Sequence, residues 1–153
     1  MAQRAEPQAE VDAATVEIGR RLADAARSAQ AYGLAAAHIG EMAPVVVLST
    51  TPGSMDYLTL YNPRVIEVST QTEKGEEGSV SLPGVRVELE RPVWAVVEFM
   101  DAQGRPQTAR LEGFAARVAL HEIDQTQGIF FLDKISRLKR DMALKKARKH
   151  SGS

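Results

Sequence analysis

The segment His-Glu-Ile-Asp-Gln at residues 121–125 has residue types and a spacing that could do chemistry. It differs by one residue from His-Glu-x-x-His, in which two imidazoles one helical turn apart bind zinc and the Glu takes a proton from metal-bound water. His121 and Gln125 are four residues apart, so they share one face of any helix formed there. Because Gln125 stands where the second His would be, this segment alone is a weak signal. A buried, hydrogen-bonded His on a helix is the commoner outcome.

Two further segments place a glycine near residues that can do chemistry. Residues 33–41 read GLAAAHIGE, in which the small residues after Gly33 would let a ligand or another backbone come close to His38. Tight packing of a helix on a strand would also explain this segment. The other segment is EEGSVSLPG, in which Ser79 follows a glycine. A Ser beside Gly is usually only part of a loop, and no Gly-x-Ser-x-Gly elbow surrounds this one.

Composition sets the class of protein and excludes some kinds of site. The chain has 153 residues, of which 44% are hydrophobic and 25% charged, as in a globular domain of ordinary size. It has no cysteine, which excludes disulfides and thiolate metal ligands. No apolar run approaches the roughly 18 residues of a membrane span, and the first residues do not resemble a signal peptide. We therefore expect a cytoplasmic location and no membrane partner.

The pattern of apolar residues predicts an α+β protein. A helix is expected at 11–31, ended by Gly33, and another at 114–125. Strands are expected at 43–50, 57–70 and 85–113, the second interrupted by Asn62-Pro63 and the third turning at the hairpin sequence DAQGRP. Residues 71–79 read as a polar loop. Residues 1–10 are expected to be disordered and 11–150 to form one domain.

A basic helix is predicted near the C-terminus, at 136–149. Residues 137–150 contain seven Lys or Arg against Asp141 alone, although the net charge of the whole chain is −1. Ile135, Leu138, Met142 and Ala143 recur at helical spacing, which indicates a docked helix with a solvated basic face. The alternative is contact with an acidic partner such as RNA. No aromatic residue lies among the charges, so we predict no specific nucleic-acid site.

Three motifs together resemble those of the peptide deformylase family. AYGLAAAH (31–38), EGSVS (77–81) and HEIDQ (121–125) match in order and spacing the family's G-x-G-L-A-A-x-Q, E-G-C-L-S and H-E-x-D-H. The similarity covers about residues 20 to 140, although the usual opening strand with Pro-x-Leu-Arg is missing. It implies the peptide deformylase fold, with mostly antiparallel strands packed around a central helix that carries HEIDQ, and helices at both ends.

The departures from the family fall on its metal site. There a Cys thiolate and two His bind Fe²⁺, Zn²⁺ or a similar metal, and the matching positions here are Ser79, His121 and Gln125. A serine hydroxyl and a glutamine amide are poor ligands for these metals, so only His121 is a good one. The resemblance thus implies a degenerate metal site, and no cofactor is expected. Asp124 is expected to have a structural role, bonded to backbone or to an Arg.

The resemblance also assigns roles around the expected pocket. Glu122 is retained as the family's general base and acid, and the backbone N–H of Val80 would face the substrate oxygen. His38 replaces the Gln that polarises the formyl oxygen. The residues expected to shape or line the pocket are Gly33, Leu34, Gly78, Ser81, Arg86 and Gln125.

Three functions are compatible with this pattern. The first is a repurposed enzyme that acts on a small amide- or carbonyl-containing substrate, with Glu122, His38 and His121 as acid–base groups and Ser79 as nucleophile or hydrogen-bond donor. The second is a non-catalytic protein that binds a peptide or a partner protein. The third is a deformylase or amidase whose Fe or Zn has moved to His38, His121 and Glu122. The altered metal positions lead us to expect weak or absent classical removal of N-formyl groups, and the third function is the alternative to this expectation.

Overall fold

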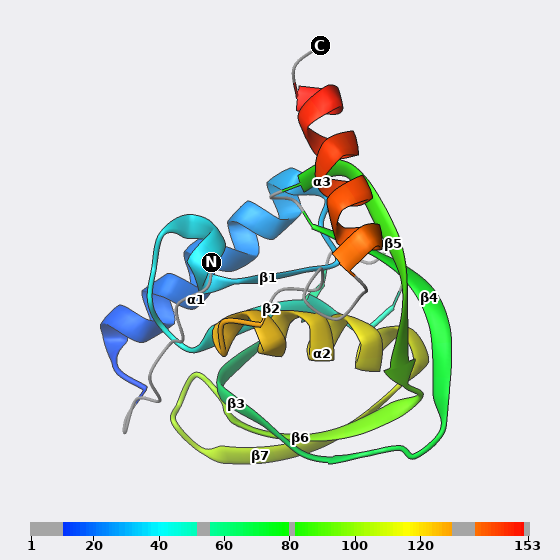
Figure 1. Ribbon diagram of the computed structural model, residues 1–153. Helices are drawn as coiled ribbons and strands as arrows, with labels where there is room; N and C mark the ends of the chain where they lie inside the picture. The colour runs from blue at the N-terminus through cyan, green and yellow to red at the C-terminus, as the bar shows by residue number, and fades with distance from the viewer. Residues whose placement is uncertain (1–10, 52–55, 80–81, 130–136, 152–153) are drawn as a thin grey trace.

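The structure is a computed structural model that describes residues 11–51, 56–79, 82–129 and 137–151, and of these the side chains of 79, 82–84 and 146–151 are left aside. The expected disorder of residues 1–10 lies outside the described residues. The helices and strands of the structure are α1 (Ala13–Ala29), β1 (Gly33–Ala35), the 3-10 helix η1 (Ala36–Ile39), β2 (Val45–Ser49), β3 (Tyr57–Val68), β4 (Thr72–Ser79), β5 (Leu82–Pro92), β6 (Trp94–Met100), β7 (Pro106–Glu112), α2 (Gly113–Thr126) and α3 (Arg137–Ser151) (Figure 1).

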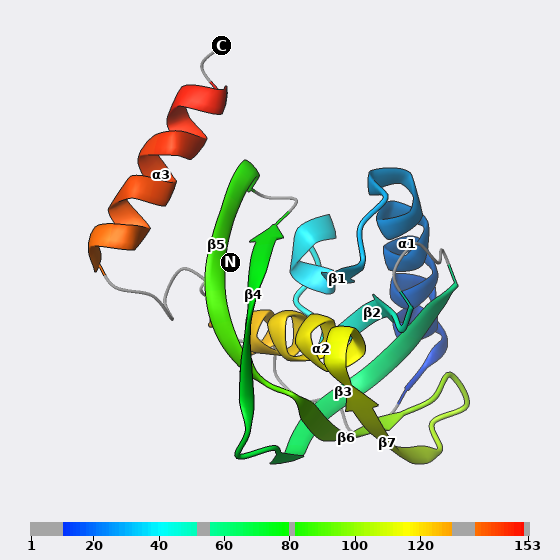
Figure 2. The same ribbon diagram turned by 90° about the vertical axis from the view of Figure 1, so that its right-hand side faces the viewer.

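The strands form two antiparallel sheets around the central helix α2. Five strands pair in the order β1-β2-β3-β6-β7, and β4 pairs with β5 in a separate ribbon. Figure 2 shows α2 between this ribbon and the five-stranded sheet, with α1 on the far side of that sheet and α3 beyond β5. This is the predicted α+β arrangement of mostly antiparallel strands around the helix that carries HEIDQ.

Strand β2 is buried on both faces, because a helix covers each of them. Val46 and Leu48 join the core cluster that α2 completes, whereas Val45 and Val47 join the cluster that α1 completes. Side chains alternate between the two faces of a strand, so the continuous apolar run of this segment serves both cores. All five β2 residues are buried.

Helix α1 is shorter than predicted and does not end at Gly33. Asp12 caps its start by accepting a hydrogen bond from the Thr15 backbone N–H at 2.8 Å. The helix closes at Gln30, whose φ of 53° is left-handed and whose N–H bonds the last carbonyls. Gly33 instead begins β1, where a Cβ would lie 2.8 Å from Val118 Cγ1 of α2. A small residue is needed there for close packing rather than for ending a helix.

The segment at 71–79, expected as a polar loop, is strand β4. It pairs with β5 from Thr72 opposite Pro92 to Ser79 opposite Leu82. The prediction was wrong because most of this strand is exposed and lacks apolar alternation. Only Glu77 of its described side chains is buried, and it is held by charged groups from other elements rather than by apolar packing.

Of the two interruptions predicted in the strands, the one at Asn62-Pro63 is a bulge within a strand and the one at DAQGRP is a hairpin turn. Strand β3 runs through Asn62-Pro63 without a break, with a shift of register between Tyr61 and Arg64 and a left-handed φ of 52° at Asn62. The expected hairpin joins β6 to β7, where the Gly104 N–H donates to the Asp101 carbonyl at 2.9 Å. The Asn-Pro pair thus produces a bulge, and the Asp-to-Gly sequence produces a turn.

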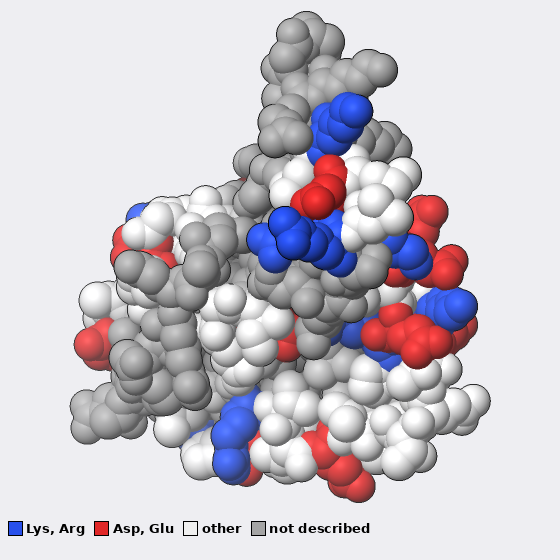
Figure 3. Space-filling model, viewed as in Figure 1, with Lys and Arg blue, Asp and Glu red and all other residues white. Residues whose placement is uncertain are grey.

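Helix α3 packs against β5, but only one of the described apolar residues that were expected to dock it is buried. The expected contact of Ile135 lies outside the described residues. Ala143 is buried, whereas Leu138 and Met142 are 71% and 63% exposed. Neighbouring helical residues point about 100° apart, so a helix that turns its small Ala143 toward the strand leaves Met142 facing solvent. In Figure 3 Lys and Arg side chains lie over this helix beside acidic ones. No helix within the described residues is long and apolar enough to span a membrane.

Candidate functional site

Helix α2 supplies most of the charged residues of the site. It begins at Gly113, whose φ of 56° turns the chain from β7 into the helix. Arg117 and His121 lie one turn apart, and Gln125 follows one turn later on the same face. His121, Glu122 and Gln125 are all buried, because β1, η1 and β5 pack against the helix. The sequence motif therefore points inward, as the helical spacing predicts.

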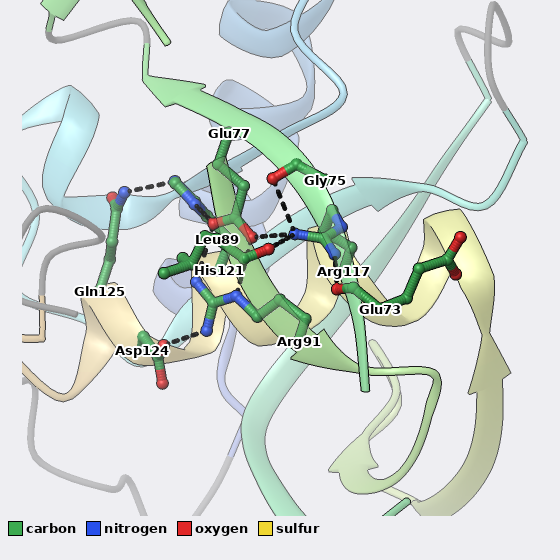
Figure 4. A network of polar contacts seen from close by, with 9 residues as sticks. All are labelled: Glu73, Gly75, Glu77, Leu89, Arg91, Arg117, His121, Asp124 and Gln125. Atoms are coloured by element: carbon green, nitrogen blue, oxygen red, sulfur yellow. Dashed lines mark hydrogen bonds and ion pairs between the residues drawn. The ribbon is translucent and has the colours of Figure 1, made fainter. Parts of the chain in front are cut away.

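A buried carboxylate, Glu77 of β4, is the centre of the network (Figure 4). Arg91 of β5 donates to both of its oxygens, at 2.8 and 2.9 Å, and Arg117 donates to Oε2 at 2.8 Å. His121 Nδ1 lies 2.8 Å from its Oε1. Burial by itself would raise the pKa of Glu77, but the hydrogen bonds from Arg91 and His121 and their charges lower it to about 2. Glu77 is therefore ionised throughout the physiological range.

Both ring nitrogens of His121 have partners within the protein. Because Glu77 is a carboxylate, Nδ1 carries the proton and donates to it, which leaves Nε2 as an acceptor in the neutral ring. The Gln125 amide nitrogen lies 3.0 Å from Nε2 and donates to it. Burial opposes protonation of His121, yet the hydrogen bond to Glu77 and the charges of Glu122 and Glu77 raise its pKa. A second proton on Nε2 would require Gln125 to turn its carbonyl oxygen toward the ring.

Asp124 has the structural partner that was predicted for it. Its Oδ2 accepts a hydrogen bond from Arg91 Nη1 at 2.7 Å. Arg91 thus joins β5 to both β4 and α2. Arg117 contributes in a similar way, because its guanidinium also donates to the carbonyls of Leu89 and Glu73 at 3.0 and 2.7 Å. These hydrogen bonds connect the β4–β5 ribbon to helix α2.

The donor set does not fit the metal of the Cys-and-two-His pattern. Of the three matching positions, His121 has its Nε2 bonded to Gln125, and Gln125 presents its amide nitrogen, which is no metal ligand, to that ring. Ser79 ends β4, and its side chain is not among those described. Within the described residues, no three His, Asp or Glu side chains form a group that could hold a metal ion.

A cavity of about 340 Å³ lies beside this network. It is formed where the end of α1 and β1 face the β4–β5 ribbon and α2. The residues that line it are Ala29, Gln30, Ala31, Tyr32, Gly33, Leu34, His38, Glu76, Glu77, Gly78, Val85, Arg86, Phe114, Arg117, Val118, His121 and Glu122. The Tyr32 and Phe114 rings meet edge to face at 4.9 Å. The volume of the cavity is at the lower end of the range found for pockets that bind small molecules.

Glu122 is a buried acidic group that lines this cavity. It is only 6% exposed, and its Oε1 has no hydrogen-bond partner among the described atoms. Burial raises its pKa to about 7, and the nearby charge of Glu77 acts in the same direction against those of His121 and Arg91. A carboxyl group with this pKa can accept or release a proton near neutral pH.

His38 lies at the cavity from the opposite side, at the end of η1. Its Nδ1 lies 3.3 Å from the Ala35 N–H and 3.1 Å from the Ala35 carbonyl oxygen. Burial lowers the pKa of His38, so the ring is neutral at pH 7. When Nδ1 accepts from the Ala35 N–H, the ring proton is on Nε2, where it can serve as a donor; when Nδ1 donates to the Ala35 carbonyl oxygen, Nε2 is an acceptor.

The structure brings together most of the residues that the sequence suggested for a pocket. His38, His121 and Glu122 line one cavity, as do Gly33, Leu34, Gly78 and Arg86. Gln125 does not line it. Its side chain turns behind His121 and contributes instead to the wall of a second, much smaller cavity. Val80 and Ser81 lie outside the described residues, and the roles proposed for Ser79, His38, His121 and Glu122 stay predictions.

Sequence reasoning missed three residues of the site: Glu77, Arg91 and Arg117. Glu77 was visible only as the first letter of EGSVS, and Arg91 had no local pattern. Arg117 carried a usable signal, since it precedes His121 by one helical turn and a charged residue on the apolar face of a helix needs a buried partner. Its partner on β4 could not be named without the ribbon's position.

Comparison with known proteins assigns the family. The family model for polypeptide deformylase matches residues 1–141. The chain belongs to the polypeptide deformylase family. It is 48% identical over 130 residues to a peptide deformylase-like protein of Agrobacterium fabrum, with 85% of this chain and 78% of that one covered. It is 38% identical over 133 residues to a peptide deformylase of Rhizobium meliloti, with 83% and 76% covered.

Solved deformylase structures have the same fold. A peptide deformylase from Legionella pneumophila superposes with a TM-score of 0.90 at 29% identity, covering 98% of this chain and 88% of that one. One from Synechococcus elongatus, in complex with actinonin, gives 0.87 at 31% identity, covering 95% and 80%. These comparisons confirm the predicted family and fold. They do not test the predicted loss of classical deformylation.

Proposed function

We propose that this deformylase-family chain takes a small amide- or carbonyl-containing molecule into the 340 Å³ cavity and acts on it by acid–base chemistry without a metal. The observation that carries the proposal is Glu122. A buried carboxyl group with an unpartnered oxygen and a pKa of about 7 is costly for the fold, and it is suited to transferring protons.

Glu122 would act on a water molecule beside the bound carbonyl. As the water oxygen bonds to the carbonyl carbon, the Glu122 carboxylate accepts the water proton. As the carbon–nitrogen bond of an amide breaks, the Glu122 carboxylic acid passes that proton to the leaving nitrogen. The products are a carboxylic acid and an amine, and Glu122 returns to its starting state.

His38 and the Glu77 network would support this step in different ways. Neutral His38, with its proton on Nε2, would donate a hydrogen bond to the carbonyl oxygen as negative charge develops there. Both ring nitrogens of His121 are held by Glu77 and Gln125, so His121 would keep its place beside Glu122 rather than transfer the proton itself. Ser79 and the Val80 N–H, proposed from the family pattern, would face the same ligand.

The size and lining of the cavity favour a small, partly apolar ligand. Leu34, Val85, Phe114 and Val118 supply apolar walls, while Glu122 and His38 supply the polar contacts. Such a lining suits an N-acylated amino acid or a short N-acylated peptide. The ligand would place its acyl amide between Glu122 and His38.

A variant of Glu122 tests the proposal. Purified protein, treated with a chelator and then assayed against a panel of N-acylated amino acids and dipeptides, should release free amine. Glu122→Gln should lower kcat by roughly 100-fold or more, the typical contribution of a general base. Glu76→Gln is the matched control, because Glu76 also lines the cavity but is exposed, and its kcat should change little. The proposal fails if chelation abolishes the activity or if Glu122→Gln retains it.

A second candidate function is binding without chemistry. The hydrogen bonds of both His121 ring nitrogens to groups of the protein favour it, because His121 then has no ring nitrogen left to contact a substrate. Calorimetric titration with the same N-acylated compounds separates the two candidates. Binding that is retained in Glu122→Gln, with no turnover by either protein, would favour the binding protein.

A further inference from the structure

Gln125 faces the nitrogen of His121 that a metal ion would need. In a His-x-x-x-His pair on a helix, two imidazoles one turn apart offer their nitrogens to one ion. Here Gln125 occupies the second position, and its amide nitrogen lies 3.0 Å from Nε2 of the first imidazole. Both side chains are buried, at 2% and 7% exposure, so solvent cannot easily replace this contact.

The other side of the His121 ring is fixed just as firmly. Its Nδ1 donates to Glu77, which Arg91 and Arg117 hold in place with three further hydrogen bonds. The ring therefore cannot turn to offer Nδ1 to another ligand without giving up a bond to a buried carboxylate. With Nδ1 fixed as the donor, Nε2 is the only ring nitrogen with a lone pair, and Gln125 covers it.

We infer that the Gln125 amide replaces the metal ion as the group that holds His121, so that the site is complete and closed without a metal. This inference rests on the proposed metal-free function, for which it names Gln125 as a positioning residue. The amide donates to a buried ring nitrogen, and it gives the imidazole one fixed orientation beside Glu122. Its carbonyl Oε1, buried with no partner among the described atoms, is the cost of this arrangement.

Two substitutions of Gln125 separate its hydrogen bond from its bulk. Gln125→Leu keeps much of the volume but removes the donor, which should lower Tm by roughly 2 to 12 °C, as expected for a buried acceptor left without a partner in a chain of this size. Gln127→Leu is the matched control, since Gln127 is exposed at the end of the same helix, and its Tm should change by less than about 2 °C.

Gln125→Glu changes the protonation of the His121 ring, which a change in packing alone would not do. A carboxylate at this position accepts but cannot donate, so it should place a proton on Nε2. In protein labelled with ¹⁵N-histidine at pH 8, His121 of the wild type should have one protonated ring nitrogen, and His121 of Gln125→Glu should have two. Identical ring spectra for the wild type, Gln125→Glu and Gln125→Leu would overturn the inference.

Zinc tests the exclusion of metal directly. A stoichiometric addition of zinc chloride should leave the His121 ring resonances and the Tm of the wild type unchanged. Gln125→His, which offers an imidazole in place of the amide, should show both a shift of Nε2 and a higher Tm. Displacement of the amide by zinc in the wild type would overturn the inference. If the Gln125 results hold while Glu122→Gln keeps full activity, the proposed function fails and the metal-replacing role of Gln125 stands.

Discussion

Replacing Glu77 by Gln is the most decisive test of the buried network. The substitution keeps the shape of the side chain but removes the charge that Arg91, Arg117 and His121 share. The pKa of Glu77 is about 2 in the folded protein, against an ordinary value of 4.5. A difference of about 2.5 units at 1.36 kcal/mol per unit corresponds to roughly 3 kcal/mol of unfolding free energy.

The sign of this contribution fixes its pH dependence. Because the folded-state pKa is the lower one, the unfolded chain binds more protons between the two values. The stabilisation by Glu77 is therefore fully present above pH 4.5 and is lost as the pH falls toward about 2. At pH 7 the Glu77→Gln protein should be less stable by about 3 kcal/mol, since the buried guanidinium of Arg91 and the half-buried one of Arg117 lose their shared partner.

Urea unfolding, followed by the fluorescence of Trp94, the single tryptophan, measures both effects. The gap in unfolding free energy between wild type and Glu77→Gln should be present at pH 7 and should narrow from pH 4.5 to pH 3. Glu88→Gln is the control: Glu88 lies on the same ribbon, exposed, with Lys74 at 4.0 Å, and its removal should cost less than about 1 kcal/mol. Parallel pH profiles for wild type and Glu77→Gln would refute the assignment of Glu77 as the central carboxylate.

Three further predictions concern stability. Burial raises the pKa of Glu122 from 4.5 to about 7, so between these values the folded chain binds more protons than the unfolded chain. The free energy of unfolding of the wild type should therefore fall by on the order of 3 kcal/mol as the pH rises from 4.5 to 7. Urea unfolding at pH 5 and pH 8 should show this fall in the wild type and not in Glu122→Gln. Gly33→Ala should cost about 1 to 3 kcal/mol in the same assay, because its Cβ would lie 2.8 Å from Val118 Cγ1, and an unchanged midpoint would mean that β1 can move away from α2. Asp12→Ala should cost about 1 kcal/mol by removing the cap on the Thr15 N–H, with Asp12→Asn as the control that keeps a capping oxygen.

The amino-acid sequence determined the features that depend on neighbouring residues. The helical period of 114–125 fixed that His121 and Gln125 share a face, and α2 bears this out. The DAQGRP segment fixed the hairpin between β6 and β7 because Gly104 supplies the positive φ that the turn needs. The three motifs, read together, identified the family and with it the fold.

Local patterns failed where distant segments decide the environment of a residue. Strand β4 is polar and exposed, so nothing in residues 71–79 marks it as a strand, and pairing with β5 makes it one. Gly33 was expected to end a helix, but its small size serves a contact with α2. Of the residues expected to dock α3, Ala143 is buried as predicted, whereas Leu138 and Met142 face solvent.

The chemistry of the site was likewise decided by tertiary structure. The sequence identified Glu122 as a candidate proton carrier, but its pKa of about 7 comes from its burial in the folded protein and from the charge of Glu77. The sequence also showed that Gln125 is a poor metal ligand. That its amide bonds to Nε2 of His121 depends on the orientation of the ring, which Glu77 fixes from another strand. Spacing along one helix sets which side chains can meet, whereas the groups packed around them set their charge and their partners.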